Sequence, residues 1–336
     1  MLRVAGLVLA LAVLVVVCIL SVRIGSRSIP LPTVLDALWA GPREIVPGTM
    51  GGDEAFIVWN LRVPRTIIGL FAGAALGLAG ALMQAVTRNP LADSGLLGVD
   101  VGASTAIVFA IAFAGIATVT GYVWFSFVGA ALVSVVVYLL GSTGRAVTPE
   151  RMVLAGAAIS AVLGAVISAV LLLDPATFQA YRFWSVGSLA SRGLDVAVGV
   201  APFLIAGFLL GLGVARPLNA LALGDDAGRA LGARVERTRL VAAAAITLLC
   251  GAATAAAGPI GFVGLTVPHI ARMIVGTDQR WVLPYTMVLA PILVLSADVV
   301  GRVIVAPAEM EVGIITAFVG APVFIALSRR RRIVSL

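Results

Sequence analysis

The stretch LRVPRTIIGLFAGAALGLAGALMQAVTRNPLADSGLLGVDVG, residues 61–102, decides the fold that the sequence predicts. It opens with an apolar run that carries a small residue at every fourth position. The polar segment RNPLADSG, residues 88–95, follows and is rich in turn-forming residues, and a second apolar run comes after it. About 20 apolar residues are enough to cross a bilayer, so this pattern predicts membrane helices joined by a polar turn.

The composition of the whole chain agrees with a membrane protein. Of its 336 residues, 61% are hydrophobic and 12% are charged, and the mean hydropathy is +1.12. So few polar side chains cannot cover a water-soluble domain, so we expect one all-α, polytopic transmembrane domain over residues 1–336. A charge at the centre of a span costs about 2.5 to 3.5 kcal/mol, so charges mark loops. Cutting the chain at its charges and turns predicts ten spans: 4–22, 64–84, 95–114, 122–140, 152–173, 196–215, 239–257, 260–275, 283–301 and 312–328.

The basic residues predict the orientation of these spans. All 23 basic residues are arginines, and a cytoplasmic N-terminus would place roughly fifteen of them on the cytoplasmic side. We therefore expect both termini in the cytoplasm. The net charge of +7 then reflects topology and attraction to lipid headgroups, and no nucleic-acid partner is expected, because no basic surface interleaved with aromatic residues is present.

Residues that the sequence lacks exclude two energy sources. The chain has no lysine, hence no phosphate-binding loop of the G-x-x-x-x-G-K-[ST] type, and is not expected to hydrolyse ATP alone. Asp100 and Asp298 fall near predicted helix ends, so a carboxylate relay for protons or sodium is not indicated. Cys18 and Cys250 lie inside spans and His269 is the only histidine, so neither a metal site nor a catalytic site is expected.

Small residues at four-residue spacing mark two of the predicted helices. The second span carries Gly69, Gly73, Gly77 and Ala81, and the fifth carries Gly156, Ser160, Gly164 and Ser168. Such stripes allow two helix backbones to approach closely. Packing within one subunit explains such a stripe in most helices. For the fifth span, contact with a second subunit or with a pathway stays equally open, because its serines offer hydroxyl groups.

The longest cytoplasmic insert, residues 216–239, has the pattern of a short helix. Asp225 or Asp226 is expected to cap this helix and Gly232 to end it. Three small or apolar residues share one face: Ala227, Ala230 and Leu231. Two interpretations remain, an interfacial helix in the headgroups and a lever that fits a groove on a cytoplasmic motor protein.

Two arginines lie at the predicted outer end of the second span, where a helix dipole disfavours cations. Arg62 and Arg65 bracket Pro64, and Arg302 lies at the outer end of the ninth span. This placement indicates an acidic partner on the outer side. Ordinary contact of arginine side chains with headgroups is the alternative.

Seven blocks of the chain, in this order, resemble iron-chelate and cobalamin import permeases of the FecCD/BtuC type, the membrane subunits of type II ABC importers. They are LRVPR (61–65), GAALGLAGALMQAVTRNPLADSGLLGVDVGA (73–103), RFWSVGSL (182–189), LGDDAGRALGA (223–233), GPIGFVGLTVPHIAR (258–272), SADVVGR (296–302) and EVGIITAFVGAPVFIALSRRR (311–331).

The resemblance implies a BtuC-like fold of ten helices, with an inverted repeat that relates spans 2–5 to spans 7–10. It also implies partners: a second permease subunit in a homo- or heterodimer, two cytoplasmic ABC ATPase subunits, and an extracytoplasmic substrate-binding protein. The ATPases would use ATP and Mg, and this chain would bind no cofactor. Such a subunit spans the cytoplasmic membrane of a bacterium.

Site residues follow from the same resemblance. Arg62, Arg65 and Arg302 match arginines that meet carboxylates of the binding protein. The residues that match the ATPase-coupling helices are Leu223, Gly224, Asp225, Asp226, Ala227, Arg229, Ala230, Leu231 and Gly232. The inner gate matches Thr148, Pro149 and Glu150, of which the last two depart from the small hydroxyl residues usual there. The pathway is implied between paired fifth and tenth spans.

The cargo is the least determined part of the prediction. A ferric siderophore is the first choice because it is frequent in this family, and haem or cobalamin is the alternative. An ion-coupled secondary transporter and a purely structural membrane scaffold are competing classes. The importer predicts a stable ATPase partner, whereas the secondary transporter predicts dependence on an ion gradient.

Overall fold

A computed structural model describes residues 2–25, 27–42, 52–93, 98–116, 118–141 and 149–329. Within these ranges the regular elements are all helices. Ten of them coincide with the ten predicted spans: α1 (Leu2–Arg23), α4 (Val63–Thr87), α5 (Val99–Ala114), α6 (Val119–Gly141), α7 (Pro149–Leu173), α9 (Leu194–Gly213), α12 (Val235–Ala257), α13 (Val263–Val275), α14 (Gln279–Ile304) and α15 (Val312–Arg329). Seven helices of the described chain are long and apolar enough to cross a membrane, and α5, α13 and α15 are shorter apolar helices.

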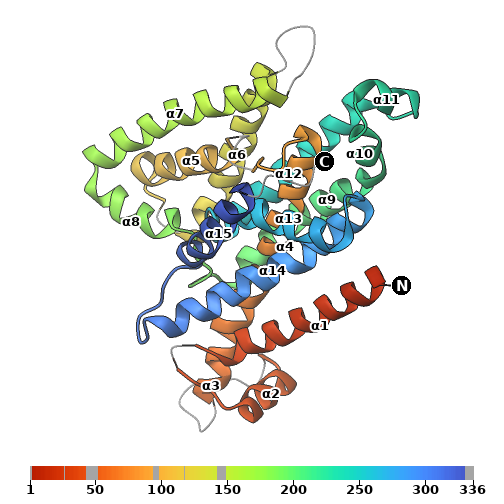
Figure 1. The fold of residues 1–336 in the computed structure, drawn as a ribbon. Helices are drawn as coiled ribbons and strands as arrows, with labels where there is room; N and C mark the ends of the chain where they lie inside the picture. Colours follow the sequence, from red (N-terminus) through yellow and green to blue (C-terminus); the bar gives the residue numbers. More distant parts are fainter. Residues whose placement is uncertain are drawn as a thin grey trace.

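Short helices lie at the two ends of the bundle. The end that we call the α2 end carries α2 (Leu31–Ala40), α3 (Gly52–Ile57) and α8 (Pro175–Ser185), and the opposite α11 end carries α10 (Ala215–Leu221) and α11 (Asp225–Ala230) (Figure 1). The coupling segment predicted from the sequence is therefore helical and lies far from α2 and α3.

Helix α4 continues α3 through one π-helical turn, η2 (Val58–Arg62). Pro64, in the first turn of α4, has no N–H to donate to the preceding turn, and such a gap favours a wider local helix. The 36 residues from Gly52 to Thr87 thus form one helical segment. This places Arg62 and Arg65 on either side of the change in helix geometry, at the α2 end.

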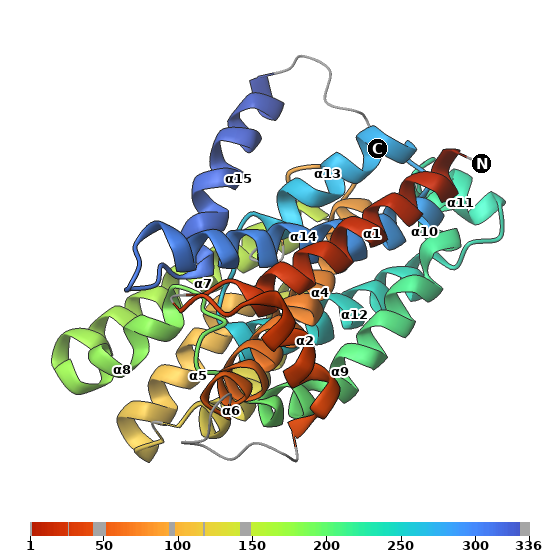
Figure 2. The same cartoon turned by 90° about the horizontal axis from the view of Figure 1, so that it is seen from below.

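Helices α4 and α12 form the centre of the bundle, and the other spans surround them (Figures 1 and 2). In the most apolar 18-residue stretch, 83% of the residues are buried for the segment that contains α4 and 67% for α12. Glycines make the close approach possible, because a Cβ at Gly80 would lie 2.0 Å from the Gly264 carbonyl oxygen of α13. A Cβ at Gly73 would lie 2.7 Å from Cα of Pro291 in α14. The stripe of α4 therefore packs within this chain.

Helix α7 lies at the edge of the molecule (Figure 1), and only 11% of the corresponding stretch is buried. Its exposed residues include Leu154, Val162, Leu172 and Leu173. A Cβ at Gly164 would meet nothing within 4 Å. The stripe of α7 is therefore only partly covered by this chain, with open space at Gly164, in contrast to the stripe of α4.

Candidate functional site

A buried ion cluster joins α4 and α14 at the α2 end. Arg65 donates from Nη2 and Nε to the carboxylate of Asp298 at 2.7 and 3.0 Å, and the Asp298 side chain is fully buried. Arg302, one turn further along α14, donates to the same carboxylate from Nε at 3.0 Å. A buried carboxylate of this kind is stable only while its guanidinium partners remain, because burial removes its water.

The same cluster holds the end of α1. Arg302 donates from Nη1 to the carbonyl oxygens of Ser21 and Ile24 at 2.7 and 2.9 Å. Arg62 donates to the Val22 carbonyl at 3.0 Å and also contacts the carbonyls of Arg23 and Arg27. The last carbonyls of a helix have no donors within it, and cations are favourable there. The two arginines therefore fasten α1, which is otherwise largely exposed, to the rest of the bundle.

The three arginines predicted to dock a partner are thus nearly buried, with 5%, 8% and 2% of Arg62, Arg65 and Arg302 exposed. They line one wall of a half-open cavity of about 240 Å³ that also contains Arg27 and Glu309. Arg65 donates from Nη1 to Glu309 at 2.6 Å. The structure brings the predicted residues together, but their guanidinium groups already have internal partners. Asp298 was not predicted from the sequence to be such a partner.

The coupling segment differs from the sequence prediction in its cap. We expected Asp225 or Asp226 to cap α11, and this was wrong, because the residue before the helix is Gly224 with φ +108°. Only glycine adopts that conformation without strain. The predicted end is confirmed: Gly232, with φ +83°, donates its N–H to the Arg229 carbonyl at 2.9 Å.

Asp225 has a different role, since it ties α11 to two spanning helices. Its carboxylate accepts a hydrogen bond from Arg239 of α12 at 3.0 Å and another from Arg88, the left-handed cap of α4. Burial alone would raise the pKa of Asp225, but Arg239 and Arg88 outweigh it and hold the pKa below its ordinary value. The carboxylate is therefore charged at neutral pH and joins α4, α11 and α12.

A second tie joins α10 to α14. Asn219 of α10 donates to Asp278, the N-cap of α14, at 2.7 Å, and accepts from the Gln279 N–H at 2.8 Å. Burial opposes ionisation of Asp278, but the hydrogen bond from Asn219 and that from the Arg280 N–H lower its pKa overall. The α10–α11 segment is thus connected to the ends of three spanning helices, so a displacement of it reaches all three.

The outer face of this segment is apolar and uncovered. Leu223 is 67% exposed and Leu231 is 66% exposed, and Ala227 and Ala230 are exposed beside them. The face predicted from the sequence therefore exists, enlarged by Leu223. Exposed leucines at a membrane protein's polar end favour a protein partner over water.

The predicted gate falls mostly outside what the structure describes. Thr148 lies outside the described residues, and Pro149 and Glu150 are placed only as the first backbone positions of α7. Of the α7 stripe, Gly156 is buried and Ser160 and Gly164 are half-buried. Ser168 is exposed, and its hydroxyl donates to the Gly164 carbonyl at 2.8 Å.

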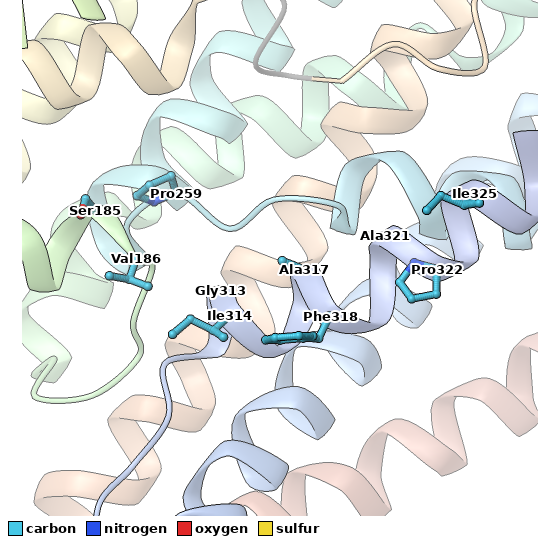
Figure 3. A pocket seen from close by; sticks show the side chains of 10 residues that line it. All are labelled: Ser185, Val186, Pro259, Gly313, Ile314, Ala317, Phe318, Ala321, Pro322 and Ile325. Carbon is cyan, nitrogen blue, oxygen red and sulfur yellow. The ribbon is translucent and has the colours of Figure 1, made fainter.

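An apolar cavity of about 690 Å³ lies beside α15 (Figure 3). It is lined by Ser185, Val186, Pro259, Gly313, Ile314, Ala317, Phe318, Ala321, Pro322 and Ile325. Phe318 is 73% exposed, so the cavity is open on the side of α15. Of the segments that line this cavity, only the tenth span was among the two, the fifth and the tenth, that were predicted to border the pathway. The segments around Val186 and Pro259 were missed, since no local pattern reports that they meet α15.

Comparison with known proteins shows the family to which this chain belongs. Residues 13–330 match the FecCD transport family. The chain belongs to the FecCD transport family. This FecCD-family chain is 48% identical over 323 residues to the ferric enterobactin transport system permease protein FepD of Escherichia coli, which covers 96% of this chain and 94% of that relative.

Two further relatives transport other iron compounds by name. The Fe(3+)-citrate import system permease protein YfmD of Bacillus subtilis is 38% identical over 84% of this chain and 84% of the relative. The hemin transport system permease protein HmuU of Yersinia pestis is 34% identical over 96% of this chain and 94% of the relative. The expected family is therefore confirmed, and the chain is a multi-pass permease of the ABC-transporter type.

A solved structure has the same fold. An inward-facing metal-chelate type ABC transporter shares a TM-score of 0.83 and 26% identity with this chain, over 96% of this chain and 98% of that one. The all-helical, BtuC-like fold of ten spans is thereby confirmed. In this chain, spans 2–5 are helices α4–α7 and spans 7–10 are helices α12–α15. These are the two four-helix sets that the resemblance relates by an inverted repeat.

Proposed function

We propose that this FecCD permease imports a ferric siderophore across the cytoplasmic membrane, driven by a separate ATPase. The observation that carries the cargo is the 48% identity to a ferric enterobactin permease over nearly the whole chain, against 34% to a hemin permease. Haem and cobalamin are the alternative cargoes. The proposal places the termini and the α11 end in the cytoplasm, and the α2 end outside.

The pathway of the proposal lies between two permease subunits. Helix α7 is covered only in part, with open space at Gly164 and an exposed Ser168, and α15 borders a wide apolar cavity that this chain does not close. A bulky chelate needs a wide passage with few fixed polar contacts, and a second subunit would supply the missing wall. The inner gate, residues 148–150, would lie at the cytoplasmic entrance to α7.

The driving force would enter through the α10–α11 segment. The exposed apolar face around Leu223 and Leu231 would seat in a groove of an ABC ATPase, which binds ATP and Mg. Closure of two ATPase subunits would displace α11, and the ties from Asp225 and Asn219 would pass the movement to α4, α12 and α14. This chain itself would carry out no covalent chemistry.

The binding protein would dock at the α2 end, over the cavity lined by Arg62, Arg65 and Arg302. Carboxylates of the binding protein would reach the guanidinium edges that border this cavity. Because the three arginines also hold α1 and Asp298, reversing their charge would disturb the fold as well as docking. Arg27, 62% exposed and paired only with Glu54 in the described chain, is the cleaner position for a docking variant.

Transport in reconstituted vesicles tests this proposal. The permease, an ABC ATPase that co-purifies with it and a siderophore-binding protein are placed in proteoliposomes, and uptake of radioactive ferric enterobactin, hemin and cobalamin is measured with and without ATP. We expect ATP-dependent uptake of the ferric siderophore. Accumulation against a gradient by the permease alone would overturn the motor-driven function, and uptake of hemin or cobalamin alone would overturn the cargo.

A further inference from the structure

Arg65 has two guanidinium edges, and they face different partners. The Nε and Nη2 edge is occupied by Asp298, whose side chain is fully buried. The remaining Nη1 donates to Glu309 at 2.6 Å, and the Glu309 side chain is 31% exposed. The cavity of about 240 Å³ opens beside this second pair. Of the two carboxylates that Arg65 binds, only Glu309 can therefore be exchanged from outside without opening the bundle.

Glu309 also lies on the segment that leads into the pathway helix. The link 305–311 joins α14 to α15, and Glu309 comes three residues before Val312, the first residue of α15. Backbone hydrogen bonds also hold this region, among them those from the Met310 N–H to the Gly301 carbonyl at 3.0 Å and from the Gly313 N–H to the Gly187 carbonyl at 3.1 Å. The ion pair with Arg65 is the side-chain tie that connects the link to α4.

We propose that Glu309 is an internal stand-in for the carboxylate of the docking partner, and that its displacement from Arg65 transmits docking to α15. In the free permease Glu309 occupies Nη1 and holds the link 305–311 against α4. A carboxylate from the binding protein takes that position and frees Glu309, so the start of α15 becomes more mobile beside the pathway cavity. The inference rests on the docking role proposed above.

The exchange is energetically accessible because it replaces one carboxylate by another. Arg65 is never left without a partner on its outer edge, which avoids the cost of an unpaired, mostly buried cation. Glu309 is already partly exposed, so its release into water requires little further hydration. Asp298 cannot take part in the same exchange, since its side chain has no exposed surface.

The test compares two substitutions that remove the same charge from the same link. Glu309→Gln removes the stand-in, whereas Glu311→Gln is the matched control, because Glu311 has no ion pair within the described chain. Wild type and both variants are placed in lipid nanodiscs. Fluorescence anisotropy measures binding of a labelled hexaglutamate peptide, with hexaglutamine as the uncharged control. Hydrogen exchange measures the backbone of residues 312–320 with and without the peptide.

We expect Glu309→Gln to bind hexaglutamate roughly fivefold more tightly than Glu311→Gln, because the internal competitor is gone. Exchange in residues 312–320 should be faster in Glu309→Gln, and hexaglutamate should accelerate it in wild type but add nothing in that variant. Equal affinities for the two variants, or unchanged exchange, would overturn the role of Glu309. The transport assay uses the wild type, so transport that persists alongside equal variants leaves the proposed function standing.

Discussion

Helices α4 and α7 are each 25 residues long, and both carry small residues at four-residue spacing, yet the protein uses them in opposite ways. In the apolar stretch of the segment that contains α4, 83% of the residues are buried, against 11% for α7. Gly73 and Gly80 meet the backbones of α14 and α13, whereas a Cβ at Gly164 would meet nothing.

The difference teaches that a small-residue stripe specifies a close approach but not the partner. In lipid, apolar side chains gain little by burial, so packing at glycines and polar ties must select the neighbours. Helix α4 has both, with glycines along its length and Arg65 and Arg88 at its ends. Helix α7 carries a stripe that this chain covers only in part, so a further partner for it is expected from outside the chain.

The largest loss of stability is expected when the buried carboxylate of Asp298 is removed. Asp298→Asn leaves Arg65 and Arg302 buried without their shared carboxylate, and breaking such a pair costs about 3 to 5 kcal/mol. We expect little monodisperse protein after extraction in detergent, measured by fluorescent size-exclusion chromatography. Asp226→Asn, at a fully exposed side chain, is the control and should leave the yield unchanged. Equal yields would show that α4 is not anchored by this cluster.

The next largest loss of stability is expected at the glycine contact of α4. It tests the contrast between α4 and α7 directly. Gly80→Ala places a Cβ 2.0 Å from the Gly264 carbonyl, and the overpacking should cost about 3 kcal/mol. Gly164→Ala makes the same chemical change in α7, where there is open space, and should leave stability unchanged or slightly raised. Thermal unfolding of both variants in one detergent measures the difference. A similar loss in the two helices would break the contrast.

A smaller loss of stability is expected at Asp225, because its side chain is 31% exposed. Asp225→Asn should cost about 1 kcal/mol or less, while separating α11 from α4 and α12. Since the folded pKa is lowered, the ties are complete above the ordinary pKa of about 4 and are lost as the pH falls through the folded value. Hydrogen exchange of residues 225–230 should therefore accelerate in Asp225→Asn, or on acidification of the wild type. Within the described chain Asp226 pairs only with Arg229, so Asp226→Asn should behave as wild type.

The smallest effect on the subunit itself is expected in α7. Gly164→Phe should change the stability of the isolated subunit by less than about 0.5 kcal/mol, since the position is open. It should nevertheless reduce the fraction of paired permeases, measured by mass photometry in nanodiscs. Val162→Phe, at a 61% exposed position on the opposite face of α7, is the matched control. Pairing that survives Gly164→Phe would assign the stripe to lipid instead.

The sequence predicted the ten spans well because the charges that separate them are costly in hydrocarbon. It also predicted that Arg62, Arg65 and Arg302 lie at the same end of the bundle, and the structure brings them together around one cavity. It did not predict their partner, since Arg65 and Asp298 are separated by 233 positions and no local pattern joins them. In the sequence, an aspartate near a helix end has the same pattern whether its side chain is solvated or buried in the fold.

The predicted cap of α11 was wrong for a related reason. Asp225 has the right residue type and position for a cap, but two arginines from distant helices bind its carboxylate, and Gly224 supplies the backbone geometry instead. The cavity beside α15 was not predictable either, because it is formed by three segments that are separate in the chain. Local pattern thus predicts elements, whereas the contacts between them depend on the fold.

The crossing of Gly80 over Gly264 has a mechanical consequence. The two backbones meet directly there, and the buried Gln84, one turn further along α4, donates to the carbonyls of Gly264 and Leu265 at 3.1 and 3.2 Å. Arg272 of α13 donates to the oxygen of the same side chain. The two four-helix sets are thus held in register at the centre of the protein, so a displacement that reaches α4 is passed on to α13.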